Sequence, residues 1–269
     1  MVSQEFADEE GTPLRGGNVS AVVRVGDTVR RSSGPWTPAV HDLLRFLESE
    51  GFAWSPHVLG IDTADREVLE YVEGEVGYYP LRPYMWADTV LDDVARALRC
   101  LHDTTLGFPA RADAASWRDH PGPYGEPEVM CHTDWSPYNA VFREERFVSM
   151  IDWDFANPGS RVWDLAWVAI TWIPLGDDEH AARVGWAHPP DRAARLNRLV
   201  DAYGFGPRRE LLPAILARLD ATAGWIERRA EQGDPAFARM VAEGHHDGYR
   251  RHRRFVEEHW QVLSDAAEY

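Results

Sequence analysis

The chain has 269 residues, which is long enough for one large domain or for two lobes with separate cores. Its formal net charge of −16 disfavours nucleic-acid and membrane binding, and it would either attract cationic small molecules or simply keep the surface solvated. The two cysteines give no disulfide framework, the N-terminal residues do not resemble a signal peptide, and no apolar run is long enough to cross a bilayer. We therefore expect a soluble cytoplasmic protein.

The first part of the chain is predicted to be a small β-rich unit with one helix. The predicted elements are a hairpin, a helix and two further strands, at residues 14–31, 37–51, 56–62 and 66–74. The hairpin carries the turn signals GGN and VGD. In the helix, Thr37 is the expected N-cap, Pro38 occupies the first helical position and Gly51 is the expected stop.

The rest of the chain is predicted to be mostly helical. A helix at 86–104 has one apolar face, and a Pro/Gly-rich loop follows at 107–126. After the segment 129–150, which carries strand patterns, helical periodicity returns in four long stretches, at residues 161–173, 189–204, 208–232 and 237–269. The sequence therefore predicts a small β-rich lobe followed by a larger helical lobe.

Polar side chains gather in the segment VMCHTDWSPYNA, at residues 129–140. Pro137 lies between Asp134 and Asn139, so this segment is expected to be a loop and not a helix. His132 comes two residues before Asp134, and on a near-extended loop the two side chains point the same way. We expect His132 to brace this loop by hydrogen bonding.

A hairpin is predicted immediately after Asn139, and its second strand ends at Asp152. Folding the hairpin back brings Asp152 near Asn139. Carboxylate and amide oxygens are hard ligands that suit Mg²⁺. We therefore expect Asn139 and Asp152 to hold Mg²⁺, and Asp134 to face the acceptor hydroxyl as the catalytic base.

The spacing His132-x-Asp134-x-x-x-x-Asn139 resembles the catalytic loop of protein kinases, and Asp152-Trp153-Asp154 stands where kinases have Asp-Phe-Gly. The segment CHTDWSPYNAVF, followed by MIDWDFANPG and WDLAW, is more similar to the aminoglycoside phosphotransferase family of small-molecule kinases. The resemblance is specific at residues 130–167.

The resemblance implies an α+β, bilobal protein-kinase-like fold, with a small antiparallel β N-lobe that carries one helix and a larger, mainly helical C-lobe. It implies a nucleotide-binding lobe at residues 1–74 and a catalytic and acceptor-binding lobe at residues 75–269. By the same resemblance Asp164 would anchor the catalytic loop from below, although an acid at a helix start is also common without such a role.

A nucleotide kinase needs backbone N–H groups over the phosphates and a cation on their oxygens. Gly16, Gly17 and Asn18 form the first hairpin turn and are the expected phosphate cradle. The strand GDTVRR has no lysine, where the family has one. Arg30 is the candidate replacement and Arg31 is the alternative, because an arginine can clamp phosphate through its planar fork.

The family also pairs its lysine with an acid of the following helix. That helix offers His41 and Asp42 at roughly the expected place, so the cation would pair with one of these or the pair would be lost. The segment VLEYVEG resembles the hinge between lobes, and it implies that the backbone of Glu70 and Val72 binds the nucleotide base. Nothing in this segment distinguishes ATP from GTP.

These expectations describe a kinase that transfers the γ-phosphoryl of ATP or GTP to a hydroxyl of a small acceptor. The acceptor would be an aminoglycoside-like antibiotic or another hydroxylated metabolite, and Trp135 could wall its pocket. One alternative is a kinase-like protein that binds nucleotide or ligand without turnover, since the lysine is missing. Another is a hydrolase that uses Asp152 and Asp154 as a carboxylate pair on one face of a strand.

Overall fold

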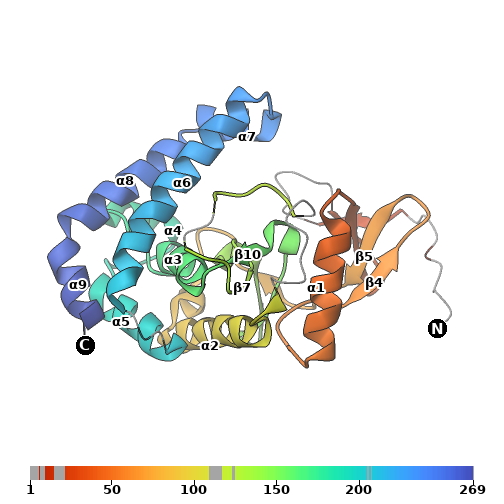
Figure 1. Cartoon of the computed structure of the whole chain (residues 1–269), viewed down its shortest axis with the longest axis horizontal. Coiled ribbons are helices and arrows are strands. Elements are labelled where there is room, and N and C mark those ends of the chain that lie inside the picture. The colour runs from red at the N-terminus through yellow and green to blue at the C-terminus, as the bar shows by residue number, and fades with distance from the viewer. Residues whose placement is uncertain are drawn as a thin grey trace.

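The computed structural model describes residues 6, 10–14, 22–108, 117–122, 125–204, 206 and 208–268. Residues 266–268 are described by their backbone alone. The chain combines antiparallel sheets with many helices. Figure 1 shows β4, β5 and α1 at one end of the molecule and α5, α8 and α9 at the other, with α2, β7 and β10 between them and α7 at the top, above the middle. This arrangement agrees with a β-rich unit followed by a helical one, while the division at residue 74 stays a proposal.

The N-terminal sheet has five antiparallel strands in the order β1-β2-β3-β5-β4. Its strands are β1 (Thr12–Pro13), β2 (Val22–Val25), β3 (Thr28–Ser32), β4 (Val58–Ile61) and β5 (Arg66–Glu70). Gly26 and Asp27 turn β2 into β3, and Gly26 has a φ of 58°, which glycine adopts without strain. The predicted VGD turn is therefore confirmed. The GGN turn at Gly16, Gly17 and Asn18 lies outside the described residues.

Helix α1 (Thr37–Ser49) packs its apolar face against the core through Val40, Leu43, Leu44 and Leu47. The prediction of Thr37 as N-cap is wrong by one residue, because Trp36 occupies that position. The Thr37 hydroxyl instead accepts a hydrogen bond from the Gly34 N–H at 2.9 Å and fixes the turn before the helix. The predicted stop is confirmed, since Gly51 follows the helix with a φ of 76°.

Two small sheets and three short 3₁₀ turns frame the centre of the chain. They are formed by β6 (Glu75–Val76), η1 (Pro83–Trp86), β7 (Val129–Cys131), η4 (Pro137–Asn139), β8 (Ala140–Arg143), β9 (Arg146–Met150), η5 (Trp153–Phe155) and β10 (Asn157–Gly159). Strands β8 and β9 pair as an antiparallel hairpin, as predicted, and β6 extends their sheet. Strand β7 pairs with β10, which places the segments before and after the hairpin side by side.

The remaining described elements are helices. They are α2 (Asp88–Thr104), α3 (Arg161–Trp172), α4 (Asp178–Val184), α5 (Arg192–Tyr203), η6 (Arg208–Glu210), α6 (Leu211–Glu231), α7 (Pro235–Ala242), α8 (His245–Glu258) and α9 (Trp260–Glu268). The last predicted stretch divides into α7, α8 and α9, and Gly244, with a φ of 76°, separates α7 from α8. No helix among the described residues is both long and apolar enough to cross a membrane.

Helix α2 buries the apolar face that its periodicity predicts, and Leu98 at its centre is fully buried. Leu98→Ala is expected to lower the free energy of unfolding by about 2–5 kcal/mol, because the substitution leaves a cavity that the packed neighbours fill only partly. Denaturant unfolding would measure this loss. Arg96→Ala on the exposed face of the same helix should change stability by less than about 0.5 kcal/mol. Equal effects of the two variants would contradict the assigned core.

His180 of α4 and His252 of α8 lie ring against ring, with centroids 4.2 Å apart. Burial lowers the pKa of His180 to about 4, and burial and the neighbouring His180 lower that of His252 to about 3. Both rings stay neutral in the folded protein at pH values where the unfolded chain binds protons. Stability is thus full above about pH 6.5, the ordinary histidine value, and falls as the pH drops toward 4.

Between pH 7 and pH 5 we expect the free energy of unfolding to fall by about 1–2 kcal/mol for the pair, a figure reduced for the rings' partial exposure. His252→Phe should flatten this part of the curve. Denaturant unfolding at a series of pH values measures both effects. An unchanged slope in the variant would count against neutral buried rings.

Candidate active site

The loop at residues 132–139, the expected catalytic loop, is fixed from below by the buried carboxylate of Asp164, the fourth residue of α3. Asp164 Oδ2 accepts the His132 N–H at 2.8 Å, and Oδ1 accepts the Thr133 N–H at 2.9 Å. Burial alone would raise the pKa of Asp164, but the hydrogen bond from His102 and the loop N–H groups hold it below its usual range. Asp164 therefore remains an anion that anchors the loop.

Thr133, the residue before Asp134, has a φ of 64°, which is rare for a β-branched residue and costs of order 1–3 kcal/mol. Its neighbours hold it in place. The hydroxyl donates to the Phe155 carbonyl at 2.8 Å, and the carbonyl accepts from Nη2 of Arg218 at 2.7 Å. With the bond to Asp164, the N–H, C=O and hydroxyl of Thr133 all have partners, and this fixes the direction of the next residue.

Arg218 of α6 is fully buried and has a second support. Its guanidinium lies over the rings of Trp163 and Trp167 at 4.7 and 5.0 Å. Burial lowers the pKa of Arg218, and the carboxylate of Asp164 opposes this change. A buried cation that touches the backbone of the catalytic loop was not apparent from the sequence, because α6 lies about 85 residues away along the chain.

The carboxylate of Asp134 is surrounded by hydrogen-bond donors. Oδ1 accepts from the Ser136 hydroxyl at 2.7 Å, the Tyr138 hydroxyl at 2.7 Å and the Trp167 indole N–H at 2.9 Å. Oδ2 accepts from the Asn139 side-chain amide at 2.9 Å. Burial, followed by the charge of Asp134, raises the pKa of Tyr138, so its hydroxyl remains a donor. Oδ2 is the oxygen with room for a further donor.

Asn139 and Asp152 are brought together by the hairpin, as the sequence predicts. The Asn139 carbonyl accepts the N–H of Ile151 at 2.8 Å, and Asp152 is the next residue. Asn139 directs its amide nitrogen to Asp134, which leaves its side-chain oxygen for another partner. The Asp152 side chain is 42% exposed, and the backbone of this residue has a φ of 64°. One carboxylate and one amide oxygen form a hard donor set that fits Mg²⁺.

The two arginines of β3 lie on opposite faces of the sheet. Arg30 pairs with the buried carboxylate of Asp62 at 3.3 Å. Arg31 contacts Asp152 through Nη1 at 2.7 Å and Asp154 through Nη2 at 2.6 Å. The geometry therefore favours Arg31, and not Arg30, as the cation near the expected metal ligands.

Asp154 joins a second arginine to this cluster. Its Oδ2 accepts from Nη1 of Arg118 at 3.0 Å, and the Arg118 guanidinium lies over the rings of Trp36 and Phe155 at 4.2 and 4.3 Å. Burial raises the pKa of Asp154 to about 6, although Arg31 opposes this change. Asp152 and Asp154 are not on a strand, because a 3₁₀ turn begins at Trp153. The strand placement that the hydrolase alternative assumes is therefore wrong, and both carboxylates contact the guanidinium of Arg31.

His132 lies where a brace is expected. Its Nε2 lies 3.1 Å from the Ile151 carbonyl, and its Nδ1 accepts the Asp134 N–H at 3.3 Å. Burial lowers the pKa of His132, so the ring is neutral with its proton on Nε2. The same ring packs edge-on against Trp153 at 4.7 Å. His132 thus links the catalytic loop to the strand that leads to Asp152.

The expected hinge residues lie at the end of β5. The Glu70 N–H donates to the His57 carbonyl at 2.9 Å, and its carboxylate pairs with the His57 ring at 3.1 Å. Val72 is half-buried and lies just beyond the strand. Trp135 is fully buried in the core, so it does not wall an acceptor pocket as expected.

Comparison with known proteins decides the family. Residues 80–255 match the phosphotransferase enzyme family, and this range contains the loop, the hairpin and α3. The chain belongs to this family. The resemblance to the aminoglycoside phosphotransferase family is thereby confirmed, and the protein is a phosphotransferase.

Two relatives and two solved structures illustrate the range of the family. The trifolitoxin immunity protein of Rhizobium leguminosarum bv. trifolii is 37% identical over 196 residues, which cover 71% of this chain and 73% of that protein. The homoserine kinase of Phenylobacterium zucineum (strain HLK1) is 28% identical over 172 residues, which cover 48% of this chain and 51% of that protein.

Choline kinase from Cryptosporidium parvum Iowa II has a TM-score of 0.61 at 11% identity, over 94% of this chain and 91% of that one. Macrolide 2′-phosphotransferase MphH from Brachybacterium faecium has a TM-score of 0.54 at 17% identity, over 87% and 92%. These structures share the fold, so the predicted α+β kinase-like architecture is confirmed.

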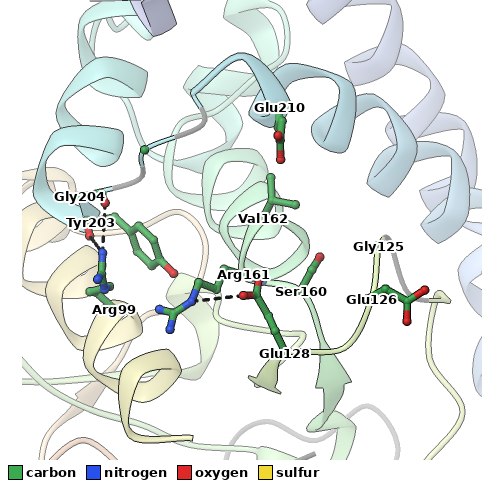
Figure 2. Close-up of a pocket in the computed structure, with 11 residues that line it drawn as sticks. Arg99, Gly125, Glu126, Glu128, Ser160, Arg161, Val162, Tyr203, Gly204 and Glu210 are labelled. Atoms are coloured by element: carbon green, nitrogen blue, oxygen red, sulfur yellow. Dashed lines mark hydrogen bonds and ion pairs between the residues drawn. The ribbon is translucent and has the colours of Figure 1, made fainter. Parts of the chain in front are cut away.

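A cavity of about 510 Å³ lies elsewhere on the phosphotransferase, between the start of α3 and the end of α5. Figure 2 shows Arg161, Glu128, Tyr203 and Arg99 around it, with Arg161 turned toward Glu128 and Arg99 toward the carbonyls that end α5. Its lining contains none of the expected catalytic or metal-binding residues. The convergence of catalytic groups, and not this cavity, therefore marks the candidate active site.

Proposed function

We propose that this phosphotransferase is a small-molecule kinase that moves the γ-phosphoryl of ATP or GTP to a hydroxyl of a small acceptor. The observation that supports it best is the link between Asp134, Asn139 and Asp152. The Asn139 side chain binds the Asp134 carboxylate at 2.9 Å, and its backbone binds the residue before Asp152 at 2.8 Å. One residue thus joins the expected base to the expected metal ligand.

Asp134 would position the acceptor hydroxyl and take its proton through Oδ2. Three donors already occupy Oδ1, so an incoming hydroxyl has its best acceptor in Oδ2. Ser136, Tyr138 and Trp167 fix the orientation of the carboxylate in this proposal. Such preorganisation contributes to catalysis because little rearrangement is needed when the hydroxyl arrives.

Asn139 and Asp152 would hold Mg²⁺, and Arg31 would bind phosphate oxygens. A magnesium ion held there would neutralise charge on the nucleotide phosphates. The Nη atoms of Arg31 present a fork that fits two oxygens of a phosphate as well as the two carboxylates that they now contact. Gly16, Gly17 and Asn18 would cradle the phosphates, and the backbone of Glu70 and Val72 would bind the base.

The proposed acceptor is an aminoglycoside-like antibiotic or another hydroxylated metabolite. One relative is a trifolitoxin immunity protein and another is a homoserine kinase, so we include trifolitoxin and homoserine among the candidates. A role in immunity to a toxin is the second candidate function, favoured by the 37% identity to the trifolitoxin immunity protein.

The test is a screen for acceptor-dependent release of ADP or GDP in the presence of Mg²⁺. The panel would contain aminoglycosides, macrolides, choline, homoserine and trifolitoxin, each with ATP and with GTP. The product would be identified by a mass increase of one phosphoryl group. If Mg²⁺ and ATP or GTP stabilise the protein against heat but no hydroxyl compound is phosphorylated, the non-catalytic binding alternative replaces this proposal.

A further inference from the structure

The guanidinium of Arg31 has two differently occupied sides. Its Nη atoms contact Asp152 and Asp154 at 2.7 and 2.6 Å, while its Nε forms an ion pair with Oε1 of Glu67. Burial would lower the pKa of Arg31, but Asp154, Asp152 and Glu67 together raise it above its ordinary value. The guanidinium is therefore a permanent cation at the junction of three carboxylates.

Glu67 is held by the sheet and by α1. It lies on β5 directly across from Arg31 on β3, because the antiparallel register pairs the two residues. Its side chain is 2% exposed, and Oε2 lies 3.0 Å from Nε2 of His41 on α1. A buried carboxylate with a cation on one oxygen and an imidazole on the other has a single well-defined orientation.

The helix itself supplies no acid to this cluster. Asp42, the acid of α1 nearest to the expected position, has a side chain that is 78% exposed, and it lies 3.7 Å from Arg45 on the same helix. The buried face of α1 presents His41 instead. Among the described residues, the polar link from α1 to Arg31 runs through His41 and Glu67.

We propose that Glu67 of β5 is the acid that positions Arg31 for the nucleotide phosphates, and that His41 of α1 positions Glu67. This inference rests on the proposed function, because it presumes that Arg31 binds phosphate. Glu67 holds the Nε side of the guanidinium, which keeps the Nη side directed at Asp152 and Asp154, where the magnesium ion and the nucleotide phosphates of the proposed function would lie. Glu67 and His41 are positioning residues, since both act through Arg31.

A second buried pair on the same strand provides the control. Arg30 contacts Asp62 on the other face of the sheet, and the Asp62 side chain is fully buried, as that of Glu67 nearly is. Asp62→Asn and Glu67→Gln each remove one buried negative charge beside an arginine of β3. The two variants should both lower stability, but only Glu67→Gln should weaken nucleotide binding.

The experiment is a double-mutant cycle on the dissociation constant of ADP with Mg²⁺, measured by calorimetry on the full chain. Arg31→Met is expected to raise this constant by roughly 10- to 100-fold, and Glu67→Gln by at least about fivefold. The double variant should bind about as weakly as Arg31→Met alone, because Glu67 acts through the guanidinium. Asp62→Asn should bind as the wild type does.

His41 gives a test that does not depend on the folding of Glu67→Gln. His41→Phe keeps a ring but removes the donor to Glu67, and it should raise the ADP dissociation constant several-fold, whereas His41→Gln should restore the donor and most of the affinity. Additive effects in the cycle, or equal affinities of the two His41 variants, would overturn the inference. Absence of ADP binding by the wild type would overturn the proposed function as well.

Discussion

Asp134→Ala is expected to abolish phosphoryl transfer while nucleotide binding survives. The substitution removes the carboxylate that would orient the acceptor hydroxyl, and a positioned general base contributes about 10²- to 10⁴-fold to a rate. Neither the expected metal ligands nor Arg31 depends on that carboxylate for its own position, apart from the hydrogen bond to Asn139. The measurement is kcat with a substrate identified by the screen, together with calorimetry of ADP binding in Mg²⁺.

Trp167→Phe provides the companion measurement. It removes one of the three donors to Oδ1 of Asp134 but retains the aromatic packing on Arg218, so a smaller loss of kcat is expected. Near-full turnover by Asp134→Ala would exclude Asp134 as the base and would require another acceptor for the proton.

Asp152→Asn is expected to remove the magnesium-dependent part of nucleotide binding. An amide retains an oxygen but lacks the negative charge that attracts Mg²⁺, so the affinity for ADP in Mg²⁺ should fall by more than about tenfold. Arg31 still has Asp154 and Glu67 as partners, and the fold should persist. Calorimetry of ADP binding, carried out once with Mg²⁺ and once with EDTA, separates the part of the ADP affinity that depends on the metal from the part that does not.

The contrast between the two aspartates is the decisive result. Asp134→Ala should keep the difference in ADP affinity between Mg²⁺ and EDTA, whereas Asp152→Asn should lose it. A magnesium dependence that survives in Asp152→Asn would assign the metal to other oxygens of the site.

The sequence predicts how the loop and the hairpin bring their polar residues together, because these residues are close together along the chain. His132, Asp134, Asn139 and Asp152 lie on one loop and one hairpin, and local turn and strand signals suffice to bring them together. The same reasoning placed the buried face of α2 correctly. Short-range patterns are reliable where the geometry is set by neighbouring residues.

The supporting residues could not be predicted because tertiary packing brings them together. Arg218 reaches Thr133 across 85 positions, and Arg31 reaches Asp152 across 121. The choice between Arg30 and Arg31 depends on which face of the sheet each residue occupies, and a one-residue change in register reverses it. Trp135 adjoins Asp134 in sequence but is buried in the core, so adjacency alone was a poor guide to its role.

The position of Glu67 on a strand determines which segments must be exchanged together when this site is transferred to a related chain. Arg31 and Glu67 face each other across β3 and β5, and the same guanidinium reaches the acids that follow β9. A chimera that takes β3 from a kinase with lysine there, but keeps β5 from this chain, would place a single ammonium beside Glu67 and lose the guanidinium that contacts Glu67, Asp152 and Asp154 together. Strands β3 and β5 and residues 152–154 should therefore be exchanged together in any such chimera, although they are widely separated in the chain.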